Sequence, residues 1–448
     1  MFGHLDDPAP PPPNAAARQM VLRRASRIRR QRTVTAGLCA LALVIGVSGG
    51  ALLTGNSPTV SLAETTYQFN AQSAPLAAGQ SVPTTALVDV IFANARDGFG
   101  VVLHRSTFSL AASEDGGSTW RVVDPTLPPD FAATGNAFPG QFEFTSPQVG
   151  FLWGGTTSSG PDTAPLWVTR DGGQSWSRAA VGPGVEDVSA IGSDVWVLTT
   201  GCQMFPSSIS CIDDLEVSHD AGLTWQPGSS PSALRQSKTG QYPDDELARI
   251  TTLRAYVLEE AVGSTDFALE YTADGGQTWS SRTVPCTAPF DLGAELAASG
   301  TNDLWLICGG QAESGIQLKD LYRTDNGGQS WLLASSATGF AGGPPDPDNS
   351  PSPLPASGYL APLSVGHKNL AVLSSTTAWL LPSRGDLLIT HDGGYEWTVV
   401  PGLGGIAALQ YGGAGDVTFI SGTRGWVCAY GLGLWQTSDG VHWSVLGQ

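Results

Sequence analysis

The residues with the clearest chemical potential are aspartates that recur in one short pattern. Asp115 lies in the segment Ser113-Glu-Asp-Gly-Gly-Ser-Thr-Trp120, where hydroxyl side chains flank a carboxylate. The chemistry open to such a group is metal binding. Calcium loops, however, need several oxygen ligands that converge within about a dozen residues, and each copy of the pattern offers one carboxylate. We therefore expect these aspartates to have a structural role.

The residue types of the pattern suit a tight turn between two strands. Asp and the first Ser or Thr can hydrogen-bond to nearby backbone groups, as in Asx and Ser/Thr turns. Glycine supplies the positive φ that a side chain would penalise. The tryptophan then starts the next strand and carries a large apolar surface to bury between neighbouring sheets. The pattern therefore predicts a hairpin turn with an apolar anchor behind it.

No other group of residues matches a catalytic or cofactor-binding site. No lysine follows a glycine, so a phosphate-binding loop is absent. The histidines His219, His391 and His442 occupy variable turn positions, where we expect them to be exposed, and they lack metal-ligand spacing. Glu259 and Glu260 are adjacent in an expected strand, so their side chains should point to opposite faces. We expect no catalytic residue, cofactor or metal.

The pattern occurs seven times and indicates a repeat architecture. The fifth copy has asparagine in place of aspartate, the sixth has Glu396 in the hydroxyl position, and the seventh is one residue short. The Asp and Trp positions of the copies are Asp115 and Trp120, Asp171 and Trp176, Asp220 and Trp225, Asp274 and Trp279, Asn326 and Trp331, Asp392 and Trp397, and Asp439 and Trp443.

A pair of apolar segments precedes each copy, the second usually led by an aromatic residue. With the strand before each copy and the strand that starts at its Trp, every repeat has four antiparallel strands. The repeat averages about 52 residues, close to the length of a β-propeller blade. We predict an all-β, seven-bladed propeller over residues 86–448, with six or eight blades as alternatives. The expected pairs are 87–93 with 99–103, 142–145 with 151–153, 185–191 with 195–198, 247–251 with 255–258, 296–298 with 304–307, 370–373 with 378–381, and 417–420 with 425–428.

Two stretches depart from this regularity. The interval between the fifth and sixth copies is the longest because it contains Gly339–Tyr359, which is rich in glycine and proline and is expected to be a loop. Gly201–Asp214 is expected to be a long loop of the third blade.

The pattern resembles the Asp box, or BNR repeat, of bacterial sialidases, sortilin-type receptors and photosystem II assembly factors of the Ycf48 type. The resemblance implies a propeller with the box at the turn between the third and fourth strands of each blade. It implies little about function, because the Asp boxes of sialidases lie away from the catalytic centre. Sialidases also carry an Arg-Ile-Pro motif, an arginine triad and a Tyr/Glu pair. Here Arg-Ile occurs only at Arg27-Ile28 and at Arg249-Ile250, and the first blade has Arg96, Arg105 and Arg121 without that motif.

The chain ends differ strongly in charge and hydropathy. Seven arginines lie between Arg18 and Arg32, although the formal net charge of the whole chain is −18. Val34–Leu53 has no charged residue and is long enough to span a bilayer as a helix. The arginines before it place the N-terminus in the cytoplasm and the propeller outside. We predict a head over residues 1–33, a membrane anchor over 34–53 and a tether over 54–85. The alternative is a signal peptide cleaved after Ala63.

The oxidation state of the cysteines should indicate on which side of the membrane the propeller lies. Cys39 lies in the expected span. Cys202 and Cys211 bracket one loop, and Cys286 and Cys308 are close enough in blade order to pair, so we expect two disulfides. Cys428 should remain a buried free thiol.

The acidic propeller disfavours nucleic acid as a partner. Asp213, Asp214 and Glu216, with Asp244, Asp245 and Glu246, form either a solubilising surface or a site for cations or a basic partner. We expect a monomeric, non-catalytic binding or assembly module of the cell membrane with a protein or glycan ligand. A sialidase-like exo-glycosidase is the alternative.

Overall fold

The computed structural model describes most of the repeat region. The described residues are 76–105, 107–131, 140–154, 164–182, 184–205, 208–231, 238–239, 246–260, 267–287, 293–313, 316–337, 370–381, 387–400, 403, 416–429 and 431–447. All of them belong to one compact unit, Phe69–Gln448. The expected anchor, Val34–Leu53, and the expected loop, Gly339–Tyr359, lie outside the described residues.

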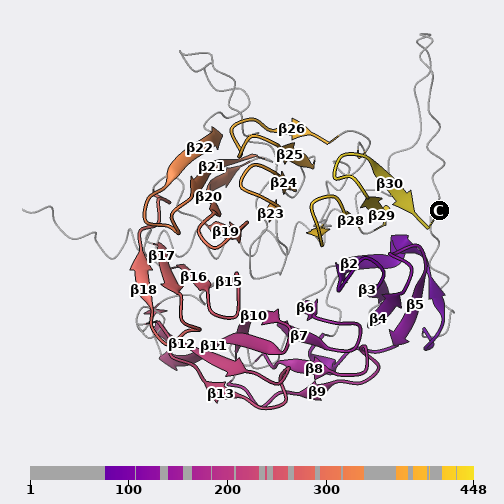
Figure 1. Ribbon diagram of the computed structural model, residues 1–448. Coiled ribbons are helices and arrows are strands. Elements are labelled where there is room, and N and C mark those ends of the chain that lie inside the picture. Colours follow the sequence, from indigo (N-terminus) through magenta and orange to yellow (C-terminus); the bar gives the residue numbers. More distant parts are fainter. Residues whose placement is uncertain are drawn as a thin grey trace, which may run out of the picture. The chain divides into compact units, whose positions relative to one another are not determined.

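Seven antiparallel sheets surround a common centre (Figure 1). Blade one contains β2 (Leu87–Phe92), β3 (Gly98–His104), β4 (Thr107–Ser113) and β5 (Trp120–Asp124). Blade two contains β6 (Gly140–Phe144), β7 (Gly150–Gly154), β8 (Trp167–Thr169) and β9 (Ser177–Arg178). Blade three contains β10 (Val185–Ile191), β11 (Asp194–Phe205), β12 (Ser208–Ser218) and β13 (Gln226–Pro227). Blade four contains β15 (Glu246–Arg249), β16 (Ala255–Glu260), β17 (Phe267–Thr272) and β18 (Ser280–Arg282).

The remaining blades follow the same order. Blade five contains β19 (Ala294–Ala298), β20 (Leu304–Glu313), β21 (Ile316–Thr324) and β22 (Leu332–Ala337). Blade six contains β23 (Leu370–Val372), β24 (Ala378–Leu380), β25 (Leu388–Thr390) and β26 (Thr398–Val399). Blade seven contains β27 (Asp416–Phe419), β28 (Gly425–Ala429), β29 (Gly433–Thr437) and β30 (Trp443–Leu446). The prediction of a seven-bladed propeller with four-stranded antiparallel blades is confirmed.

Two sheets gain a fifth strand. In blade three, β14 (Lys238–Thr239) pairs with β12. In blade one, β1 (Ser81–Val82) pairs with the outermost strand β5. A 3₁₀ helix, η1 (Thr84–Ala86), then leads into β2, and a second, η2 (Pro129–Phe131), follows β5. The last residues of the expected tether, 54–85, are therefore ordered parts of the propeller.

The expected loop at Gly201–Asp214 is wrong. The strands β11 and β12 pair continuously from Val195↔Ser218 to Phe205↔Ser208, so this segment is a long hairpin that extends beyond the blade. The sequence hides it because Gly201, Pro206 and the three serines between Cys202 and Cys211 are typical of a loop.

The blades pack on one another through apolar clusters, and there are seven clusters for the seven junctions between blades. Every cluster contains one aromatic side chain from near the start of a second strand. These side chains are at most 3% exposed: Phe99, Phe151, Trp196, Tyr256, Trp305, Trp379 and Trp426. Since burying such a side chain stabilises by several kcal/mol, these seven positions hold the ring together.

Among the residues that the structure describes, no helix has the length and apolar character needed to cross a bilayer.

Candidate functional site

In each copy of the repeated pattern, called an Asp box here after the motif that it resembles, the Asp or Asn side chain closes the turn through hydrogen bonds. In blade one, the Ser113 hydroxyl donates to Asp115 Oδ1 (2.9 Å) and accepts from the Gly117 N–H (2.9 Å). The Thr119 N–H donates to Asp115 Oδ1 (2.9 Å), and its hydroxyl donates to Oδ2 (2.7 Å). Both carboxylate oxygens are therefore engaged inside the turn, as a structural role requires.

Three further boxes repeat this arrangement with Asp171, Asp220 and Asp274. In the fifth box the Asn326 carbonyl oxygen accepts from the Ser330 N–H (3.0 Å), and its amide nitrogen donates to the Ser330 hydroxyl (2.8 Å). An asparagine can therefore close the turn because the serine hydroxyl accepts instead of donating.

The two most divergent boxes keep the turn by other means. In the sixth box, Asp392 Oδ1 accepts from the Glu396 N–H (3.1 Å) although Glu396 offers no hydroxyl. In the shortened seventh box, Asp439 accepts from the His442 N–H (2.7 Å), and His442 Nδ1 lies 2.7 Å from its Oδ2. The imidazole thus replaces the missing hydroxyl.

Hydrogen bonds within the box lower the pKa of the exposed aspartates. The Thr278 hydroxyl and N–H lower the pKa of Asp274 to about 2, and equivalent bonds from Thr224 lower that of Asp220 further. In the seventh box His442 lowers the pKa of Asp439. A carboxylate held ionised in this way is a poor general acid at neutral pH.

The Asp boxes are hydrogen-bonded to their own blade and pack against the preceding blade. In six blades a backbone N–H of the box donates to the turn between the first two strands of the same blade, as from Gly275 to Leu253 O (2.8 Å). In four boxes a glycine with positive φ faces the core aromatic of the preceding blade: Gly222, Gly276, Gly394 and Gly440. A Cβ on Gly276 (φ +83°) would lie 3.1 Å from the Trp196 ring, and one on Gly394 (φ +86°) would lie 3.1 Å from the Trp305 ring. Glycine is therefore required for close approach as well as for φ.

The Asp-box tryptophans all pack against the clusters between blades, but to different depths. Trp120 is 1% exposed and Trp397 is 9% exposed. The other five are half-buried: Trp176, Trp225, Trp279, Trp331 and Trp443. The indole N–H of Trp331 reaches back to Thr283 O of blade four (2.7 Å), so this residue links two blades as well as anchoring its own strand.

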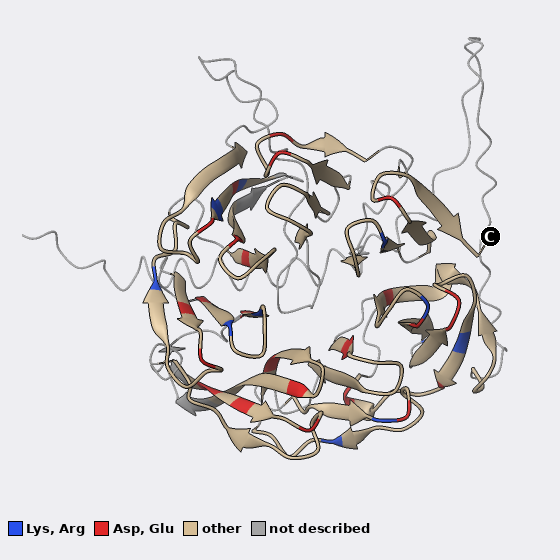
Figure 2. Cartoon of the chain, viewed as in Figure 1, with Lys and Arg blue, Asp and Glu red and all other residues tan. Residues whose placement is uncertain are grey.

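The candidate binding site is a cavity of about 270 Å³ on the central side of the ring, between the inner strands of blades one, two, three, four and seven. Three carboxylates line it, from Asp89, Glu143 and Asp187, with the aromatic residues Phe142 and Trp153. No lysine or arginine is among the described residues that line it. Figure 2 shows more acidic than basic positions along the described ribbon, including on strands near the centre.

The sequence gives no clear sign that carboxylates link neighbouring inner strands. Glu246, for which the sequence predicts an acidic surface or a cation site, is only 4% exposed and is one of these links. Asp187 Oδ2 accepts from the Leu247 N–H of blade four (2.8 Å). Glu246 Oε2 accepts from the Leu296 N–H of blade five (2.7 Å). Glu295 Oε1 accepts from the Leu370 N–H of blade six (2.9 Å). Each carboxylate therefore ties its blade to the next around the central side of the ring.

The missed signal is visible once the inner strands are aligned by their pairing. One position in six of the first strands carries an acidic or amide residue: Asp89, Gln141, Asp187, Glu246, Glu295 and Asp416. The side chain of Asp416 and the corresponding position of blade six lie outside the described residues. The sequence signal is weak because single polar residues in short strands look like ordinary alternation.

Arg249 has a structural environment that differs from that of a substrate-binding arginine. Its side chain is fully buried, forms an ion pair with Asp194 of blade three and lies 4.4 Å from the centre of the Trp196 ring. Burial lowers its pKa, whereas Asp194 favours the charged form. His219 Nδ1 also contacts Asp194 (2.6 Å), and its side chain is largely exposed. The group thus clamps blade four to blade three.

The first-blade arginines do not reach the central cavity. Arg96 and Arg121 border a separate cavity of about 580 Å³ between blades one and two, and Arg105 lies in a turn with φ of +61°. Glu259 is 4% exposed, whereas the Glu260 side chain lies outside the described residues. Within the described part of the chain, no group of three His, Cys, Asp or Glu side chains could hold a metal ion.

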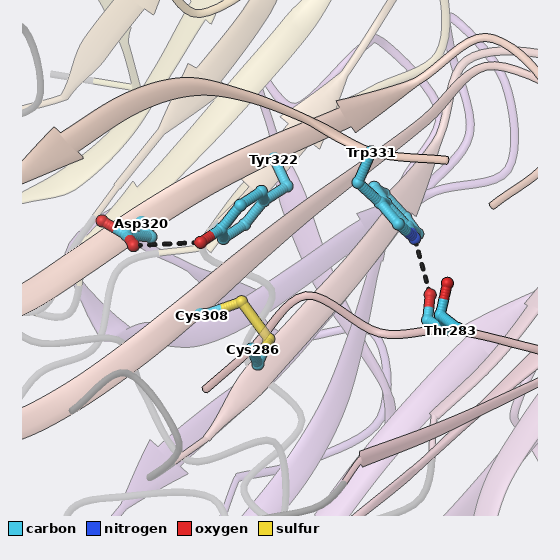
Figure 3. The surroundings of a disulfide bond; sticks show 6 residues. All are labelled: Thr283, Cys286, Cys308, Asp320, Tyr322 and Trp331. Atoms are coloured by element: carbon cyan, nitrogen blue, oxygen red, sulfur yellow. Dashed lines mark hydrogen bonds between the residues drawn. A yellow bond between two sulfur atoms is a disulfide. The ribbon is translucent and has the colours of Figure 1, made fainter. Parts of the chain in front are cut away.

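A disulfide joins Cys286, which follows β18, to Cys308 on β20, with 5.5 Å between the Cα atoms (Figure 3). It therefore links blade four to blade five beneath Tyr322 and Trp331. Cys428 is buried and lies outside this disulfide, and its thiol donates to Leu87 O (3.8 Å). Cys202 and Cys211 are direct partners in the β11–β12 ladder, and their side chains lie outside the described residues.

Comparison with protein-family models and with curated proteins gives no match. Among solved structures, the chain is similar to Ycf48 bound to a D1 peptide, at 19% identity and a TM-score of 0.48, over 82% of this chain and 99% of that one. It is also similar to Ycf48 from Cyanidioschyzon merolae, at 16% identity and a TM-score of 0.43, over 81% and 99% of the two chains. A puromycin-hydrolyzing peptidase from Mycobacterium tuberculosis matches at 12% identity and a TM-score of 0.47, over 84% of this chain and 56% of that one.

Proposed function

We propose that this chain is a non-catalytic β-propeller that acts as a binding or assembly module for a protein or glycan ligand. The observation that carries the proposal is the engagement of Asp187 in the central cavity. Its Oδ2 accepts from the Leu247 N–H and its Oδ1 accepts from the Val188 N–H, both at 2.8 Å. A carboxylate that accepts hydrogen bonds from two backbone N–H groups stabilises the contact between blades. It is poorly available for proton transfer.

The central cavity is the proposed ligand site. It is concave and combines aromatic surface with a few polar groups, as binding sites commonly do. Because Asp89, Glu143 and Asp187 line it, the ligand is a neutral or basic group of a protein or a glycan, and nucleic acid is excluded as a partner by charge. The module acts as a monomer.

The proposed location is the cell membrane, with a single span at Val34–Leu53, a cytoplasmic N-terminus and an extracytoplasmic propeller. The support is the arginine-rich segment before the uncharged stretch and the disulfide between Cys286 and Cys308, since structural disulfides persist in oxidising compartments. Protease added to intact cells should digest the propeller and spare the head. A mature N-terminus at Glu64 would instead establish cleavage of a signal peptide.

The second candidate function is exo-glycoside hydrolysis. It is favoured by one observation: Asp89 and Glu143 border the same cavity, and most glycosidases use a pair of carboxyl groups. Sialic acid itself is a poor substrate candidate, because the described lining offers no arginine for its carboxylate.

The experiment that separates the two functions uses the full chain and a Glu143→Gln variant. Fluorogenic glycosides, sialosides included, are incubated with both proteins, and each protein is also used to capture ligands by crosslinking on intact cells. A binding module captures the same ligand above background and releases no fluorophore. Release that disappears in Glu143→Gln would establish the glycosidase and overturn the proposal.

A further inference from the structure

The residues immediately before the first blade form a strap, defined here as Leu76–Ala86, that crosses the junction between blades one and seven. Its β1 strand pairs with β5 through Ser81↔Arg121 and Val82↔Trp120. The Gly79 N–H donates to Val122 O (2.8 Å), and the Val122 N–H donates to Gln80 O (2.9 Å). The strap therefore covers the outer edge of blade one.

The same strap reaches the last blade. The Thr84 hydroxyl donates to Leu446 O on β30 (3.0 Å), and the Gly431 N–H donates to Thr85 O (3.0 Å). Thr84 is buried. A segment of eleven residues thus makes hydrogen bonds to both ends of the ring.

Apolar contacts fix the strap in the junction. Leu76, Val82 and Ala86 pack against the cluster that blades one and seven share, which includes Trp120 and Trp426. This contact explains why Trp120 is only 1% exposed, whereas five of the other Asp-box tryptophans are half-buried. In blade one the strap covers the side chain that five of the other six blades leave partly open.

The junction that the strap crosses differs from the other six in one respect. Blades one to seven follow one another along the chain, so a covalent connection crosses every junction except that between seven and one. Among the described residues, only non-covalent contacts close the ring there. In a repeat protein each unit is stabilised by its neighbours, and an end unit without a covalent connection is the first to open.

We propose that the strap is a latch that keeps the ring closed, and that the junction between blades seven and one opens first when the strap is released. Because the strap continues directly into the N-terminal 75 residues, a force or a partner acting on that segment acts on the latch. Ring closure is then coupled to whatever holds the N-terminal part of the chain.

Hydrogen exchange measured by mass spectrometry on the full chain tests the latch. In one variant, residues Gln80–Thr85 are replaced by six glycine and serine residues, which keeps the chain length. We expect exchange to accelerate at least about tenfold in β5, β30 and the segment around Gly431, with β16 and β20 unchanged. A matched control replaces residues Glu64–Phe69 in the same way and should leave every blade unchanged.

A milder variant, Thr84→Val, removes one hydroxyl donor and is expected to accelerate exchange in β30 without affecting blade four. Adding the synthetic peptide Leu76–Ala86 in excess should restore protection in the replacement variant. Unchanged exchange in β5 and β30, or an equal acceleration in all seven blades, would overturn the proposal.

Discussion

The indole N–H of Trp426 donates to the carbonyl oxygen of Gly116 (3.0 Å), which joins residues 310 positions apart in the chain. The Trp426 ring also stacks on Phe92, with 3.6 Å between the ring centres. The Asp box of blade one thus rests on the core aromatic of blade seven, as the boxes of blades three, four, six and seven rest on the aromatic of the preceding blade. The box is a joint between blades, and this joint closes the circle.

The first prediction concerns the glycine that makes the equivalent joint between blades five and six possible. Gly394→Ala should destabilise the protein by about 2–5 kcal/mol, since a positive φ costs about 1–2 kcal/mol and crowding in a packed core about 1–3 kcal/mol. The added methyl group would lie 2.4 Å from Leu321 Cδ2 and 3.1 Å from the Trp305 ring. Chemical denaturation of the variant and of the unsubstituted protein measures the difference in their free energy of unfolding.

The control for this substitution is Gly192→Ala. Gly192 also has a positive φ (+63°), but a Cβ there would meet nothing within 4 Å. It should therefore show only the backbone cost of about 1–2 kcal/mol. Equal effects of the two substitutions would mean that the contact with the preceding blade contributes nothing.

The second prediction separates two kinds of tryptophan. Trp305→Ala should cost about 3–5 kcal/mol because this side chain is fully buried between blades. Trp176→Ala should cost clearly less, because its side chain is half-buried. Denaturation midpoints of the two variants measure the difference, and a larger loss at Trp176 would contradict the assignment of the core.

The sequence was sufficient for the architecture because each repeat combines two local signals. The Asp-box turn marks the third and fourth strands, and the apolar pair before it marks the first two. The expected strands 87–93 and 99–103 therefore agree with β2 and β3 to within one residue at each end. Turn chemistry is local in the chain, and local signals are those that a sequence displays directly.

The contacts between blades could not be predicted in the same way. The bond from Leu247 N–H to Asp187 spans 60 residues, and its acceptor looks like a solvated side chain in an alternating strand. The predicted tether extends to residue 85 because Ser81–Val82 is too short to stand out as a strand. Both features depend on which segments lie side by side in the folded ring. A local sequence pattern does not show this.

The third prediction is a pH dependence of stability. Bonds from Thr278 lower the pKa of Asp274 from its ordinary 3.8 to about 2 in the folded state. The ionised form is therefore favoured by folding, and its contribution is complete above pH 3.8 and is lost as the pH falls through about 2. Asp274→Asn should flatten the stability curve between these values. A curve identical to that of the unsubstituted protein would contradict the hydrogen-bonded box.

The fourth prediction concerns the links between inner strands. Glu246→Ala leaves the buried Leu296 N–H without its acceptor and should cost about 1–3 kcal/mol. Glu246→Gln keeps a carbonyl oxygen at nearly the same place and should cost less. If both variants are as stable as the unsubstituted protein, the carboxylates do not tie the blades together.

The fifth prediction is a thiol count on the denatured, unreduced full chain. The chain has six cysteines, and Cys39 and Cys428 are expected to be free. Two free thiols would support disulfides at Cys286–Cys308 and at Cys202–Cys211, whose backbones already face each other in the ladder. Four free thiols would remove the second pair, and six would remove both.

The proposed function is tested most directly by a photo-crosslinking amino acid placed at two positions of the full chain. Ile91 lines the central cavity, whereas Ser118 lies in the exposed turn of the first Asp box. The proposal predicts that one discrete adduct with a cellular protein or glycan forms from position 91, forms at background level from position 118, and is weakened by Glu143→Gln. An adduct that forms equally from both positions, or none from position 91, would contradict a ligand site in the central cavity.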